Sequence, residues 1–75
     1  MINTILDAIE FVLEDLAEPQ SPYWLASQME EMKLWRATER DVRAALEKDI
    51  KKWGEETQFV KVGDDEYGLR SWDES

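Results

Sequence analysis

Cysteine and histidine are both absent from this chain of 75 residues, which also has only three glycines and two prolines. Without cysteine there is no disulfide and no thiolate nucleophile, and without either residue type the usual zinc ligand sets cannot form. The lack of histidine also removes the commonest general base of enzyme mechanisms. We therefore expect a protein that is not an enzyme, with no cofactor, no metal site and no small-molecule substrate.

Long apolar runs are also missing. The first ten residues contain no basic segment and no uninterrupted apolar stretch, so neither a signal peptide nor a membrane-spanning segment is predicted. We accordingly expect a cytoplasmic protein with no membrane partner.

The short chain leaves room for one hydrophobic core. Four tryptophans, two tyrosines and two phenylalanines supply apolar area that disordered chains lack, so we expect a folded domain. We assign residues 1–72 to a single domain and residues 73–75 to a frayed acidic tail.

Basic residues are scarce, and their placement is uneven. Nine Lys and Arg stand against eighteen Asp and Glu, a net charge of −9, whereas freestanding nucleic-acid binders are usually basic. Residues 33–52 nevertheless hold seven basic and four acidic side chains, a net charge of +3, which leaves −12 for the remainder. This basic segment indicates contact with phosphates or with an acidic partner, or simply the solvated outside of a helix.

The spacing of apolar residues predicts three helices, over residues 4–17, 22–33 and 39–53. Thr4 with Asp7, and Thr38 with Asp41, have the spacing of capping boxes at the start of the first and third helices. The third helix places its apolar stripe on one side and most of its basic residues on the other.

Two β-prone runs on either side of a Gly-Asp-Asp-Glu turn predict a hairpin over residues 58–72. Pairing Val62 with Tyr67 places Val60 opposite Leu69, with all four side chains on the same face. We therefore expect this register.

Three helices followed by a hairpin is the order of an α+β winged helix-turn-helix domain, although other small α+β arrangements share it. The third helix would be the recognition helix and the hairpin would be the wing. The predicted core consists of Ile9, Leu13, Leu16, Leu25, Met29, Leu34, Val42, Leu46, Ile50, Val60 and Leu69.

Several segments resemble the HARE-HTH winged-helix family over roughly residues 5–72. They are FVKVG and YGL in the hairpin at 59–63 and 67–69, AAL and DIKK in the third helix at 44–46 and 49–52, and the second-helix residues Leu25, Ala26 and Met29 with the following Leu34 and Trp35. The ending at 68–72 is further similar to the folded domain of the delta subunit of bacterial RNA polymerase, an acidic family member.

This resemblance implies a non-catalytic module of transcription or its regulation. The first hypothesis is docking on RNA polymerase or on another protein of the transcription machinery. The alternative is a DNA-binding module that reads duplex DNA through the basic third helix, with weak or conditional contact because the acidic wing tip would repel phosphates. A DNA mimic would also be acidic, but it would not require a basic helix.

Two sets of side chains are candidate contacts. The basic candidates for nucleic acid or a partner are Arg36, Arg40, Arg43, Lys48 and Lys51, and the aromatic candidates for a protein contact are Phe11, Trp24 and Trp72. Asp64, Asp65 and Glu66 lack the spacing of a calcium loop, so we interpret them as a solvated turn.

Overall fold

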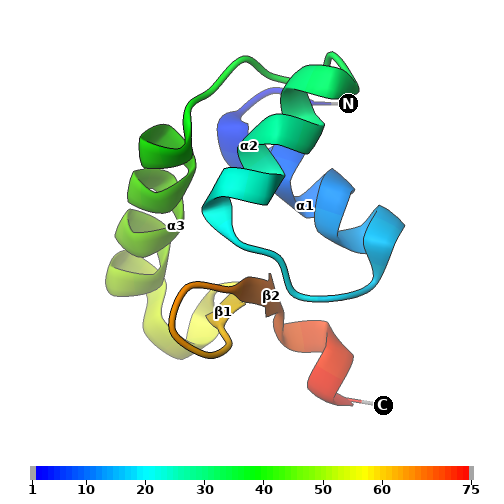
Figure 1. The fold of residues 1–75 in the computed structure, drawn as a ribbon. Coiled ribbons are helices and arrows are strands. Elements are labelled where there is room, and N and C mark those ends of the chain that lie inside the picture. The colour runs from blue at the N-terminus through cyan, green and yellow to red at the C-terminus, as the bar shows by residue number, and fades with distance from the viewer. Residues whose placement is uncertain (1, 75) are drawn as a thin grey trace.

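The computed structural model describes the backbone of residues 2–74 and the side chains of residues 2–72. The elements in chain order are α1 (Ile5–Leu16), α2 (Pro22–Glu31), α3 (Glu39–Trp53), the 3-10 turn η1 (Gly54–Glu56), β1 (Phe59–Lys61), β2 (Tyr67–Leu69) and the 3-10 helix η2 (Arg70–Glu74). Three helices pack together, and the hairpin lies below the C-terminal end of α3 (Figure 1). The predicted α+β winged helix-turn-helix fold is confirmed. The tail predicted at 73–75 lies outside the described side chains and stays a prediction.

The first and third helices begin at threonine caps. The Thr38 hydroxyl accepts from the Asp41 N–H at 3.2 Å, and the Asp41 carboxylate accepts from the Thr38 N–H at 3.1 Å, so this capping box is complete. At α1 only half of the box forms. Thr4 accepts from the Asp7 N–H at 3.2 Å, but the Asp7 carboxylate accepts from the N–H of Asn3 instead.

Two non-glycine residues with positive φ end α1 and α2. Ala17 has φ 59° after α1, and Lys33 has φ 58° after α2. The Lys33 N–H donates to the Glu30 carbonyl at 3.1 Å, while the Leu34 N–H donates to the Met29 carbonyl at 2.9 Å. This pair of bonds is a Schellman motif, and it turns the chain from α2 toward α3.

The hairpin has a register one residue away from the predicted one. The observed pairs are Phe59 with Leu69, Val60 with Gly68, and Lys61 with Tyr67. The predicted pairing of Val60 with Leu69 and Val62 with Tyr67 is therefore wrong. Phe59 is 1% exposed whereas Val62 is 41% exposed, so the larger aromatic side chain takes the buried position.

A single residue of the α1–α2 connection extends the sheet. Gln20 pairs with Tyr67, because each N–H donates to the other residue's carbonyl, at 3.0 Å and 2.9 Å. On the other face of the hairpin the Trp72 ring covers β2. A Cβ atom added at Gly68 would lie 2.7 Å from a carbon of that ring, so glycine permits this close approach.

The core lies between the three helices and the inner face of the hairpin. Its buried hydrophobic residues are Ala8, Ile9, Val12, Leu13, Leu25, Ala26, Met29, Val42, Leu46, Phe59, Tyr67 and Leu69. Of the predicted members, Leu16, Leu34 and Ile50 are half-buried and pack against this core. Val60 was placed in the core wrongly, because the observed register turns it to the other face of the hairpin.

Candidate functional site

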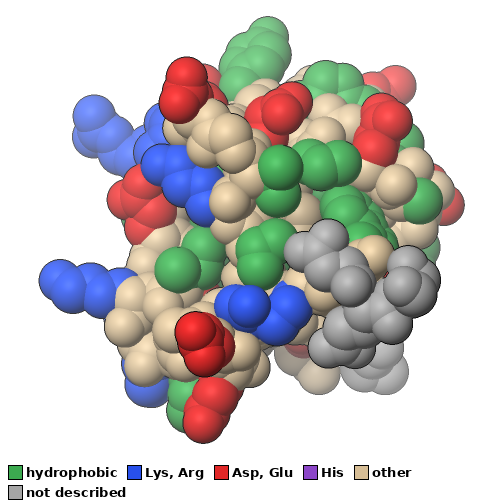
Figure 2. Space-filling view, turned by 90° about the horizontal axis from the view of Figure 1, so that it is seen from below, with side chains coloured by type: hydrophobic (Ala, Val, Ile, Leu, Met, Phe, Trp, Pro, Cys, Tyr) green, Lys and Arg blue, Asp and Glu red, His purple; other side chains and the backbone are tan. Residues whose placement is uncertain are grey.

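The outer side of α3 carries a basic face, which we define as Arg40, Ala44, Lys48 and Lys51. Val42 is fully buried on the inner side, whereas all four members of the basic face are exposed. Ala44 lies four residues from both Arg40 and Lys48 and seven from Lys51, so the three cations surround a small side chain. Figure 2 shows basic side chains projecting from the side of the molecule on which α3 lies.

The cations of the basic face have no partners of their own. Among the side chains of residues 2–72, ion pairs are formed by Arg43 alone, with Glu39 at 3.0 Å and with Asp65 at 2.8 Å. Within that part of the chain Arg40 and Lys48 are therefore free to bind an external anion, and so is Lys51.

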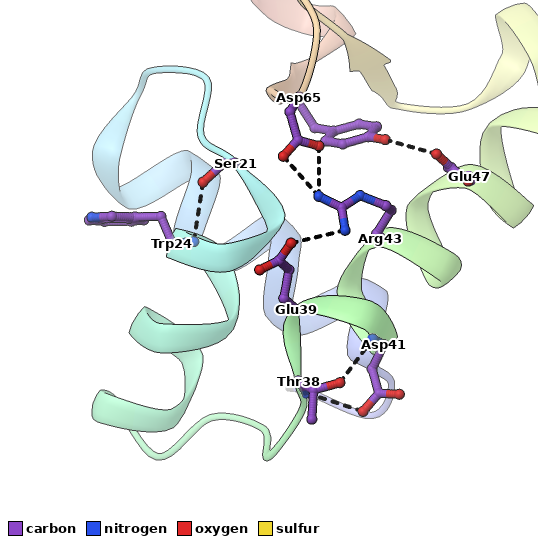
Figure 3. A network of polar contacts seen from close by, with 9 residues as sticks. Ser21, Trp24, Thr38, Glu39, Asp41, Arg43, Glu47 and Asp65 are labelled. Carbon is purple, nitrogen blue, oxygen red and sulfur yellow. Dashed lines mark hydrogen bonds and ion pairs between the residues drawn. The ribbon is translucent and has the colours of Figure 1, made fainter.

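Arg43 is held between its own helix and the wing. Its Nη2 atom donates to both carboxylate oxygens of Asp65, at 2.9 Å and 2.8 Å, while Nη1 lies against Glu39 one turn earlier (Figure 3). The hydrogen bonds to Asp65 and then Glu39 raise the pKa of the Arg43 guanidinium above its ordinary value. Of the predicted basic candidates, Arg43 is thus already engaged within the domain.

Tyr67 forms a second connection between β2 and α3. Its hydroxyl faces the Glu47 carboxylate at 3.5 Å, as Figure 3 shows, and its ring is buried. Burial raises the pKa of Tyr67 above its ordinary value, and the nearby charges of Glu47 and Asp65 raise it further. Glu47 therefore lies on the flank of α3 that faces the wing.

The wing tip is acidic and lies beside the basic face. Asp64, Asp65 and Glu66 are all exposed, and the Asp65 contact with Arg43 keeps this turn close to α3. A partner that covers both regions meets positive charge on the helix and negative charge on the wing.

Arg36 differs from the other basic candidates in its position. It is exposed but precedes α3, which begins at Glu39, so its placement on the third helix is corrected to the α2–α3 connection. The structure therefore separates the five predicted cations into three on the basic face, one ion-paired to the wing, and one in the connection.

The aromatic candidates have different environments. Phe11 is 46% exposed on α1, whereas Trp24 and Trp72 are half-buried and pack against the core. Two further exposed aromatics were not predicted: Tyr23 is 67% exposed and Trp53 is 49% exposed. Trp53 continues the apolar stripe of α3 by spacing, but it lies at the last residue of the helix, beyond the core.

Neither metal ligands nor membrane segments are found in the described part of the chain. No three acidic side chains there come close enough to hold a metal ion. None of the described helices has the length and apolar character needed to cross a bilayer.

The fold and the basic face define a winged-helix interaction module. The family model for HARE-HTH, a helix-turn-helix domain whose description names ASXL and restriction endonuclease, matches residues 3–72. The chain belongs to this family, which confirms the resemblance found in the sequence. HARE-HTH domains are winged helices that are generally DNA-binding, and the family is not a catalytic one. No curated protein and no solved structure matches the chain.

Proposed function

We propose that this domain is a non-catalytic module of transcription or its regulation, and that it docks through the basic face on an acidic surface of a protein of the transcription machinery. The observation that carries the proposal is the pairing of opposite charges on adjacent elements. Arg40, Lys48 and Lys51 are unpaired on α3 in the described structure, and the acidic wing tip lies next to them. RNA polymerase is the partner to test first, because the ending at 68–72 resembles that of the polymerase delta subunit.

Electrostatics favour a protein partner over duplex DNA. The domain measures 29 × 26 × 24 Å. Since the Debye length is about 8 Å at physiological salt, the acidic wing tip beside α3 is poorly screened from a ligand on that helix. DNA is uniformly negative and would meet the basic face and the acidic wing tip together, whereas a protein surface can supply both signs of charge.

The shape of the basic face fits close docking. Ala44 at its centre lets a partner backbone or side chain approach the helix, and the surrounding cations can form charge-assisted hydrogen bonds with carboxylates. Arg40 in particular can bind a carboxylate through two parallel N–H groups.

DNA binding is a second candidate function, favoured by the family and by the same unpaired cations. The third helix of a helix-turn-helix domain is the one that enters the major groove, and here it carries Arg40, Lys48 and Lys51 outward. Three phosphate contacts would give log K a slope of about −3 against log salt. The wing would contribute little, because its tip is acidic and Arg43 is ion-paired.

Charge reversal on the basic face tests the docking proposal. Retention of RNA polymerase purified from the same cells is measured on the immobilised domain and on the double variant Arg40→Glu with Lys51→Glu. The matched control, Lys33→Glu with Lys61→Glu, alters two exposed lysines away from the basic face and changes the net charge equally. We expect retention to be lost only in the first variant. Equal loss in both variants, or no retention by the unaltered domain, would contradict docking on polymerase.

A further inference from the structure

A second surface lies on the flank of α3 that faces α1. The first turn of α1 and the C-terminal half of α3 enclose a groove of about 390 Å³, which we call the α1–α3 groove. We infer that this groove binds an acidic peptide segment of a partner protein that carries a large apolar side chain.

The floor of the α1–α3 groove is apolar. Ile5 and Leu6 line it from α1, and both are half-buried against the core. Ala45 and Trp53 line it from α3, and Trp53 leaves 49% of its surface in solvent. Tryptophan buries a large area when a partner covers it, and it is enriched among the residues that dominate binding energy. The groove volume lies within the roughly 300–1,000 Å³ of typical ligand pockets, so it can take a large side chain.

The rim of the α1–α3 groove is basic. Lys48 and Lys52 lie one turn apart on α3, and neither forms an ion pair within the described side chains. The Lys52 ammonium lies 5.2 Å from the centroid of the Trp53 ring, a cation–π contact that keeps the charge beside the apolar floor. The Asp49 carboxylate also lines the groove, but it accepts a hydrogen bond from the Thr57 hydroxyl.

Charge complementarity therefore identifies the occupant. A segment with carboxylates on either side of an apolar residue would pair with Lys48 and Lys52 while that residue covers Trp53. DNA would satisfy the lysines but leave the apolar floor in water. The α1–α3 groove lies on a different flank of α3 from Arg40 and Lys51, so its occupancy is separate from docking through the basic face.

The test uses a synthetic 12-residue peptide rich in Glu, with Leu and Phe at helical spacing, and a second peptide in which every Glu is replaced by Gln. Binding to the ¹⁵N-labelled domain is followed by NMR. With the acidic peptide we expect the signals of the Trp53 indole N–H and of the Leu6 and Ala45 amides to move. The Gln peptide should bind at least tenfold more weakly, because it cannot pair with the lysines.

Three variants assign the site. Trp53→Ala and Lys52→Glu should each weaken acidic-peptide binding about tenfold or more, as expected of contact residues at the centre of an interface. Phe11→Ala is the matched control, since Phe11 is 46% exposed but lies outside the α1–α3 groove, and it should leave the affinity unchanged. Circular dichroism confirms that each variant is folded.

Other outcomes would overturn the inference. Equal effects of Trp53→Ala and Phe11→Ala, equal binding of the two peptides, or no binding at millimolar peptide would each exclude an acidic peptide as the occupant. Shifts at Trp53 that depend on protein concentration without peptide would assign the groove to a second copy of this chain. The variant Arg40→Gln with Lys51→Gln should keep peptide binding even if the docking proposal fails.

Discussion

Arg43 on α3 donates two hydrogen bonds to Asp65 in the turn of the hairpin, at 2.9 Å and 2.8 Å, across 22 residues of sequence. The contact joins the helix in the recognition position to the tip of the wing. Because a carboxylate of the same chain occupies this guanidinium, Arg43 holds the wing in place and is not available to a phosphate in the same way as Arg40.

Removing the Asp65 charge should loosen the wing. In Asp65→Asn we expect a lower melting temperature and faster hydrogen exchange of the hairpin amides at low salt. Both effects should shrink at 1 M salt, where the Debye length is about 3 Å. Asp64→Asn is the matched control, because it removes a neighbouring exposed charge that forms no ion pair among the described side chains. Identical melting of the two variants at low salt would show that the ion pair does not hold the wing.

The observed hairpin register predicts opposite outcomes for two truncations. Phe59→Ala removes a buried ring and should lower the free energy of unfolding by about 3–5 kcal/mol. Val62→Ala shortens an exposed side chain and should change it by no more than about 0.5 kcal/mol. Urea unfolding of both variants measures the difference. A larger loss in Val62→Ala would support the register with Val62 opposite Tyr67.

The helices could be predicted from the sequence because each has an apolar stripe of several turns and a capping residue at its start. The hairpin register could not, because each strand has only three residues and a slip of one residue changes the face of every side chain. The bridge between Gln20 and Tyr67 involves one residue on each side, so no sequence pattern predicts it.

The candidate site was predictable to the same extent. Helical spacing placed Arg40, Lys48 and Lys51 on the outer side of α3, and the structure exposes all three. The engagement of Arg43 by Asp65 depends on how the wing folds back, which spacing along one helix does not contain.

The left-handed residue after α1 makes a stability prediction with a sign. At φ 59° the Cβ of Ala17 is close to the backbone, a strain of about 1–2 kcal/mol that glycine does not have. Glycine is more flexible in the unfolded chain by about 0.5–1 kcal/mol, so Ala17→Gly should stabilise the domain by up to about 1 kcal/mol. Thermal unfolding measures the gain.

The matched control for this change is the same substitution inside a helix. Ala44→Gly lies in the middle of α3 and should destabilise the domain by about 1 kcal/mol. If both substitutions destabilise the domain equally, Ala17 is not in the left-handed conformation.

The buried hydroxyl of Tyr67 predicts a pH dependence. Its pKa is raised in the folded state, so folding stability is fully present below the ordinary tyrosine pKa of about 10 and is lost as the pH rises above it. In Tyr23→Phe, Tyr67 is the only tyrosine, and tyrosinate absorbance should appear with a midpoint above 10 while circular dichroism shows the fold intact. A midpoint at or below 10 in the folded protein would contradict the burial of this hydroxyl.

The most direct test of docking through the basic face is a titration of the isolated domain with fluorescent duplex DNA at physiological salt, followed by anisotropy. We expect weak binding or none, because the acidic wing tip and a remainder of net charge −12 oppose the +3 of residues 33–52. Submicromolar binding that is lost in Arg40→Glu with Lys51→Glu, with a salt slope near about −3, would contradict docking and establish α3 as a DNA-reading helix.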